Sequence, residues 1–113
     1  MIDVSLLKVL FDDDLMIRKY LVVFRDDLPE SLLGLREYVQ NMDWDNASIT
    51  AHNLRSKLQY LKEDGISTMA YEIEKICDEP GHLNIEKLKI LLDKIENELL
   101  EVYRKVDNYL SVY

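Results

Sequence analysis

Residues 84–113 carry the pattern that most constrains how this chain can fold. Apolar residues recur there at alternating spacings of three and four: Ile85, Leu88, Leu92, Ile95, Leu99, Val102, Val106, Tyr109 and Tyr113. This repeat predicts one long helix with a single apolar stripe, beginning near Asn84, and it is typical of the seam of a left-handed helical bundle.

Three further amphipathic segments supply partners for this helix. Residues 15–41 carry apolar residues at spacings of three and four. Pro29 lies inside that stretch, but the apolar stripe keeps its phase across the proline, which favours one kinked helix over two separate helices. A third helix is predicted for residues 46–62, with Asp45 as its N-cap, and a fourth for residues 66–78.

The connections between these segments are short. Predicted turns lie at residues 42–48, where we expect Trp44 to close the end of the core, and at residues 63–65. No segment alternates apolar and polar residues, and three Gly and two Pro are too few for a turn-rich β fold. With a short helix over residues 4–11, we expect one all-α domain over residues 1–113. Its architecture is an antiparallel four-helix bundle with a short additional N-terminal helix.

Charge and composition exclude several classes of protein. The formal net charge of −8 lacks the basic stripe that binding to nucleic-acid phosphates requires. The longest apolar run is too short to span a membrane, and the N-terminal segment carries acids where a signal peptide needs basic residues. The single cysteine fits a reducing compartment. We therefore expect a cytoplasmic protein that acts as a monomer.

Three consecutive aspartates, Asp12, Asp13 and Asp14, invite comparison with a metal site. They stand directly before the helix predicted from residue 15, where carboxylates cap the free N–H groups and complement the helix dipole. We expect this capping role, and no metal site.

One of the two histidines, His52, lies on the third predicted helix and faces away from its core. On a helical wheel, the apolar residues of this helix, including Ala51, Leu54 and Leu58, point in one common direction. His52 lies roughly 140° from that direction, so we expect its imidazole to face solvent or a groove.

Small and basic side chains surround His52 on its own helix. Ser48 and Ser56 lie one turn before and after it, Arg55 and Gln59 lie beside them, and this helix face has no carboxylate. An imidazole with an unprotonated nitrogen is a nucleophile near neutral pH. Arginine can hold a transferred phosphoryl group through two parallel hydrogen bonds. The alternative is an ordinary solvated histidine.

The fourth predicted helix offers a partner for this imidazole. Residues equidistant from the turn of an antiparallel helix pair lie at the same level, and the turn is centred near Glu63. Glu74 lies as far beyond Glu63 as His52 lies before it, so Glu74 is predicted to accept a hydrogen bond from one ring nitrogen. The other nitrogen would then be free to attack an electrophile. The alternative is that Glu74 pairs with a lysine or faces water.

The segment AHNLRS, residues 51–56, resembles the core motif of histidine-containing phosphotransfer (HPt) domains, in which Ala-His-x-Leu-Lys-Gly opens the active helix. The preceding segment DLPESLLGLREYVQNMDWDNASITAH is also similar to the family, with a proline inside a helix and an Asp-Trp turn. Glu74 falls where the family commonly has Gln or Glu. The resemblance covers about residues 10–80 in register, and the last helix fits as the fourth member of the bundle.

The chain departs from the family pattern at three positions. Arg55 replaces a lysine and keeps its charge, and Ser56 replaces a glycine that allows close approach of the partner. Lys62 replaces the glycine that often ends the active helix, and we expect Gly65 to supply the turn instead.

The resemblance implies a phosphorelay intermediate without a cofactor of its own. His52 would accept a phosphoryl group from the aspartate of a response-regulator receiver domain, such as that of a hybrid histidine kinase, and pass it to another receiver. Arg55 would stabilise the phosphoryl charge, Glu74 would orient the imidazole, and the receiver would supply Mg²⁺. Ser48, Ser56 and Gln59 would meet the docked receiver. The chain would be a phosphoryl carrier and not an enzyme.

An alternative function is that of a helical adaptor or inhibitor that docks on a receiver or kinase domain without accepting phosphate. The remaining chemically reactive residues point to no further site. We expect His82 to be a loop residue and Cys77 to pack in the core.

Overall fold

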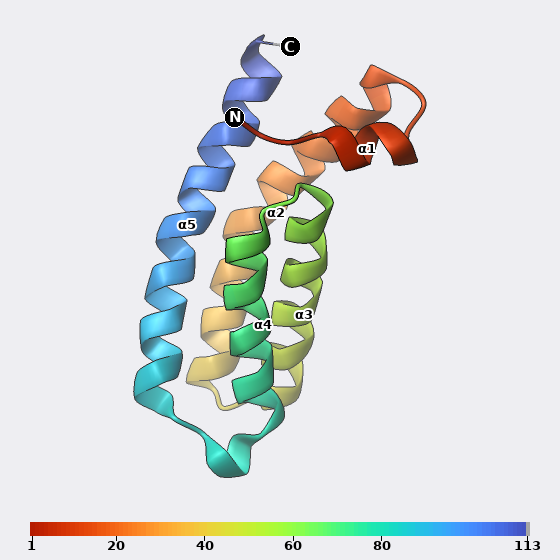
Figure 1. Ribbon diagram of the computed structural model, residues 1–113. Coiled ribbons are helices and arrows are strands. Elements are labelled where there is room, and N and C mark those ends of the chain that lie inside the picture. The colour runs from red at the N-terminus through yellow and green to blue at the C-terminus, as the bar shows by residue number, and fades with distance from the viewer. Residues whose placement is uncertain (113) are drawn as a thin grey trace.

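The computed structural model describes residues 1–112, and over that range every long element is a helix (Figure 1). The elements in chain order are α1 (Ser5–Leu10), α2 (Asp14–Gln40), α3 (Trp44–Tyr60), α4 (Asp64–Asp78), the short 3-10 helix η1 (Pro80–His82) and α5 (Ile85–Val112). The predicted all-α architecture is therefore confirmed.

The four long helices pack as a bundle (Figure 1), and the described chain measures 46 × 22 × 20 Å. Consecutive helices run antiparallel, and α3 and α4 form the most extensive contact between two elements. Helix α1 lies across one end of the bundle beside the start of α2, at the same end as the turn between α3 and α4 (Figure 1). This hairpin of α3 and α4 fixes the surroundings of His52.

The apolar stripes of all four long helices meet in one core. The stripe of α5 is buried from Leu88 to Val106, and Tyr109 packs against the core with part of its side chain. Ile85 departs from the prediction, because it opens the helix at the edge of the bundle and its side chain is 40% exposed. Tyr113, the last residue of the predicted stripe, lies outside the described residues.

The starts of α2 and α3 are set by aspartate caps. The Asp13 carboxylate accepts a hydrogen bond from the Met16 N–H at 2.8 Å, which confirms the capping role predicted for the aspartate run. The N-cap of α3 is Asp43 and not Asp45, because the helix begins at Trp44 and places Asp45 in its first turn. Across residues 1–112, His, Cys, Asp and Glu side chains form no group of three that could hold a metal ion.

Helix α2 runs through Pro29 as one element, as the unbroken phase of its stripe predicted. Trp44 packs partly buried against the core. Within the described part of the chain, no helix combines the length and the apolar character that crossing a membrane requires.

The turn between α3 and α4 differs from the prediction. It lies at Leu61 and Lys62, and α4 already begins at Asp64, so Gly65 is a helical residue with negative φ. The Glu63 N–H bonds to the Leu58 carbonyl, and the Lys62 N–H bonds to the Gln59 carbonyl, each at 3.0 Å. These two bonds form a Schellman motif, in which Lys62 takes the left-handed position (φ 54°) that glycine usually occupies.

Candidate functional site

His52 projects from the outer face of α3, as the helical wheel predicts. Its side chain is 48% exposed, whereas Ala51, Leu54 and Leu58 on the same helix are at most 1% exposed. The backbone of the site is therefore held by buried apolar contacts, while the imidazole itself remains accessible from solvent.

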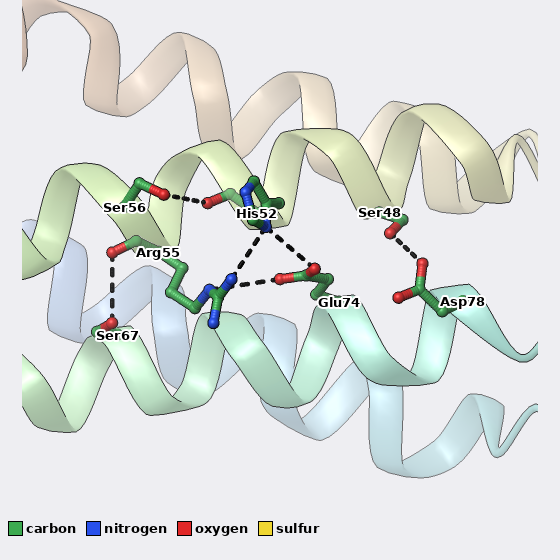
Figure 2. A network of polar contacts seen from close by, with 7 residues as sticks. All are labelled: Ser48, His52, Arg55, Ser56, Ser67, Glu74 and Asp78. Carbon is green, nitrogen blue, oxygen red and sulfur yellow. Dashed lines mark hydrogen bonds and ion pairs between the residues drawn. The ribbon is translucent and has the colours of Figure 1, made fainter.

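The predicted contact between His52 and Glu74 is present. The Nδ1 atom of His52 lies 3.1 Å from Oε2 of Glu74, which reaches across from α4 (Figure 2). The Glu74 side chain is only 14% exposed, so its carboxylate acts in an environment of low dielectric constant. Nδ1 is thereby engaged, and no hydrogen bond from residues 1–112 reaches Nε2.

Arg55 joins this pair from the next turn of α3. Its Nη2 atom lies 3.0 Å from His52 Nδ1, and its Nε atom lies 3.5 Å from Glu74 Oε1 (Figure 2). The guanidinium also stacks over the ring of Tyr71, 4.8 Å from its centroid. The sequence placed Arg55 beside the histidine but did not predict its contact with Glu74.

The main chain at Arg55 is held by a residue of α4. The hydroxyl of Ser67 is buried and donates to the Arg55 carbonyl at 3.3 Å (Figure 2). This bond ties the two helices together one turn beyond the imidazole, and it does not involve the arginine side chain.

The serines predicted to border a docking face make hydrogen bonds within the site. The Ser48 hydroxyl donates to the carboxylate of Asp78, and the Ser56 hydroxyl donates to the carbonyl of His52 at 3.2 Å (Figure 2). Gln59 is exposed on the surface. The two hydroxyls border the imidazole but are not free.

The carboxylates of this face come from α4, although the α3 sequence around His52 carries none. Asp78 was missed, yet the rule that predicted Glu74 also finds it, because Asp78 lies as far beyond Glu63 as Ser48 lies before it. Tyr71 likewise lies as far beyond Glu63 as Arg55 lies before it, and the two side chains are in contact. The antiparallel register therefore aligns three successive pairs of side chains.

A second cation lies near Arg55. The Lys75 ammonium sits 4.7 Å from the centroid of the Tyr71 ring, on which the Arg55 guanidinium also stacks. No feature of α3 alone points to Lys75. Both cations therefore lie at one ring, on a face that also carries the carboxylates of Glu74 and Asp78.

Cys77 and His82 lie outside this network. Burial, and secondarily the charge of Asp78, raises the pKa of the Cys77 thiol to about 11, so the thiol stays protonated and poorly nucleophilic at neutral pH. Its core position was predicted from the sequence and is confirmed. His82, predicted as a loop residue, is instead the last residue of the exposed 3-10 helix η1 in the connection from α4 to α5.

This arrangement allows His52 to act as a nucleophile through Nε2. When Nδ1 carries the proton and donates it to Glu74, the lone pair of Nε2 points away from the carboxylate and is available.

Comparison of the chain with models of protein families, with curated proteins and with solved structures gave no match.

Proposed function

We propose that this protein is a phosphoryl carrier of a two-component phosphorelay, with His52 as the phosphoryl acceptor. The observation that carries the proposal is the half-exposed imidazole whose Nδ1 is engaged by the shielded carboxylate of Glu74. A surface histidine without a chemical role has no need of a shielded carboxylate on one nitrogen and a cation on the same side.

The donor in this proposal is the phospho-aspartate of a receiver domain. The Nε2 lone pair attacks phosphorus, the N–P bond forms, and the bond from phosphorus to the aspartate oxygen breaks. The aspartate leaves as a carboxylate, and Nδ1 keeps its proton. The phosphorylated ring then carries a positive charge that faces the Glu74 carboxylate, which stabilises it. Transfer to a second receiver is the same step in reverse.

Arg55 neutralises charge in this step. Its guanidinium lies beside the imidazole, and its N–H groups can turn from Nδ1 to the phosphoryl oxygens as the group arrives. Phosphoryl transfer depends mainly on positioning and on neutralisation of charge. A positioned imidazole with one cation is therefore a sufficient contribution from this chain, and the receiver supplies Mg²⁺ and the aspartate.

The experiment that tests the proposal is transfer from a receiver domain carrying a radioactive phosphoryl group. We expect the wild-type chain to acquire an acid-labile, base-stable label, as a phosphoramidate does, and His52→Gln to acquire none. His82→Gln is the matched control, since it removes the other imidazole from an exposed connection. It should be labelled like the wild type.

The same experiment separates the carrier from an adaptor. An adaptor or inhibitor binds the receiver without acquiring label, and His52→Gln would bind as well as the wild type. Binding without label, across receivers that do phosphorylate a known carrier, would contradict the proposal.

A further inference from the structure

Two side chains of opposite charge, Arg55 and Glu74, contact the same atom of His52. Nδ1 lies 3.0 Å from Arg55 Nη2 and 3.1 Å from Glu74 Oε2 (Figure 2). A guanidinium nitrogen can only donate a hydrogen bond, and an ionised carboxylate can only accept one. Nδ1 of a neutral imidazole carries either a proton or a lone pair, so only one of these two contacts is a hydrogen bond at any moment.

Each choice fixes the chemistry of the other ring nitrogen. When Nδ1 donates to Glu74, Nε2 holds a lone pair and can attack an electrophile. When Nδ1 accepts from Arg55, the single ring proton lies on Nε2, which then cannot attack. The two contacts therefore stabilise two different tautomers of His52, and only one tautomer is nucleophilic at Nε2.

We infer that Arg55 is a positioning residue that sets the tautomer of His52 by competing with Glu74 for Nδ1. In the resting protein Arg55 holds part of the population in the form that has its proton on Nε2. A phosphoryl group that draws the guanidinium away leaves Glu74 as the partner of Nδ1, and the nucleophilic tautomer becomes dominant. One proton is released from Nε2 to water and one is taken up at Nδ1, so the exchange is balanced.

The contact between Arg55 and Glu74 leaves the guanidinium free to move from His52 Nδ1 to a phosphoryl group. Arg55 Nε and Glu74 Oε1 face each other at 3.5 Å, longer than a good charge-assisted hydrogen bond, and neither atom has a hydrogen-bond partner within residues 1–112. The guanidinium is thus held near the ring by Tyr71 and by charge, and not by a tight bidentate pair. Its N–H groups can exchange one acceptor for another without breaking a strong bond.

The tautomer ratio is measurable in the full chain without any phosphoryl donor. Long-range ¹⁵N–¹H correlation spectra of the ¹⁵N-labelled protein, recorded at alkaline pH, report which ring nitrogen carries the proton. His82 serves as an internal reference, since it lies in η1 and outside the site. Lys75→Ala is the matched control for charge, because it removes a cation that reaches Tyr71 without touching Nδ1.

Arg55→Ala is expected to raise the ratio of Nδ1–H to Nε2–H about fivefold, and Glu74→Ala to lower it about fivefold, the equivalent of one hydrogen bond of roughly 1 kcal/mol. His82 should not change in either variant, and Lys75→Ala should leave His52 unchanged. An unchanged ratio in Arg55→Ala, or an equal shift in Lys75→Ala, would overturn the inference.

The importance of this tautomer control for phosphoryl transfer rests on the proposed function, whereas the ratio itself is a property of the resting protein. A shifted ratio in a protein that accepts no phosphoryl group would leave Arg55 as the determinant of the tautomer and would contradict only the proposed function. Normal phosphoryl acceptance with an unshifted ratio would leave the proposed function standing and would contradict only the role of Arg55 in setting the tautomer.

Discussion

The two nitrogens of the His52 ring lie in different surroundings, and this asymmetry gives the site its proposed chemistry. Nδ1 faces the shielded carboxylate of Glu74, whereas no hydrogen bond from residues 1–112 reaches Nε2 on this half-exposed side chain. A carboxylate on one nitrogen both selects the tautomer and stabilises the positive ring that phosphorylation creates. Under the proposed function, Glu74 would therefore contribute more in the phosphorylated state than before phosphorylation.

Glu74→Ala tests this contribution. Loss of the carboxylate removes the preferred acceptor for the Nδ1 proton, so we expect the rate of phosphoryl acceptance to fall about tenfold, equivalent to roughly 1.4 kcal/mol. Kinetics of transfer from one phosphorylated receiver measure the change. The control is Glu72→Ala on the same helix, for which we expect the wild-type rate. Equal rates in the two variants would show that Glu74 plays no part in the reaction.

At this scale the sequence predicted the orientation of His52 and its partner, but not all of the network. Helical phase and equidistance from a turn depend only on backbone geometry, and they suffice for His52 and Glu74. They do not fix where a long side chain ends, so the position of the Arg55 guanidinium between Nδ1 and Glu74 could not be predicted. Asp78 opposite Ser48 could have been predicted by the same rule.

Two helices of the bundle end in a left-handed residue that is not glycine. Met42 follows α2 with φ 56°, and Lys62 follows α3 with φ 54°. In each case the Schellman hydrogen bonds form in spite of the Cβ atom, which crowds the backbone in this conformation. The α3–α4 turn that aligns the site therefore contains a strained residue.

Lys62→Gly is expected to stabilise the protein. Glycine adopts positive φ without steric cost, and after its larger entropy loss on folding the net gain is roughly 0.5–1 kcal/mol in the free energy of unfolding. Denaturant titration measures the gain, and Lys62→Ala, which keeps the Cβ atom, should show none. A glycine variant no more stable than the alanine variant would be evidence against strain at Lys62.

The outer face of α3 is where we place the docked receiver. Ser56 lies one turn beyond His52, so a bulky side chain at that position would stand between the imidazole and the partner. We expect Ser56→Leu to lose transfer while the bundle stays folded, and Ser56→Gly to transfer at least as fast as the wild type. Transfer rates from one receiver to the three forms measure this effect. Equal rates would place the docking face elsewhere.

The helices were predictable as elements, but their ends were not. The helical spacing of apolar residues predicted all four long helices, because a helix that buries one face needs apolar residues at that spacing. The start of α3 was predicted two residues late, since Asp43 and Asp45 are both good caps and only the packing of Trp44 into the first turn distinguishes them. The turn residue was predicted at Gly65, because a lysine at positive φ has no signature in the sequence.

In the whole molecule, the packing of α3 against α4 both buries the core residues and sets the geometry of the site. Leu54 and Leu58 are buried on the inner face of α3, and His52 lies on the outer face of the same helix. The contacts that hold the bundle together therefore also hold His52 opposite Glu74. A change in the core should disrupt the site, while a change in the site should leave the core intact.

Leu58→Asp tests the first half of this relation. The Leu58 side chain is fully buried, and an aspartate there would lack a partner for its charge. We expect a loss of about 4 kcal/mol or more, a large part of the stability of a domain of this size. Circular dichroism and thermal unfolding measure it, and Asn53→Asp, on the exposed face of α3, should unfold like the wild type. Unchanged helicity and melting temperature in Leu58→Asp would mean that the faces of α3 are reversed.

The most direct test of the account is the position of the phosphoryl group on the labelled protein. Nuclear magnetic resonance of the phosphorylated chain distinguishes attachment to Nε2 from attachment to Nδ1, and fragment mass spectrometry identifies the residue. We predict a phosphoryl group on Nε2 of His52, because Nδ1 is directed at Glu74 and Arg55. A phosphoryl group on Nδ1 of His52, on His82, or on a hydroxyl side chain would contradict the account.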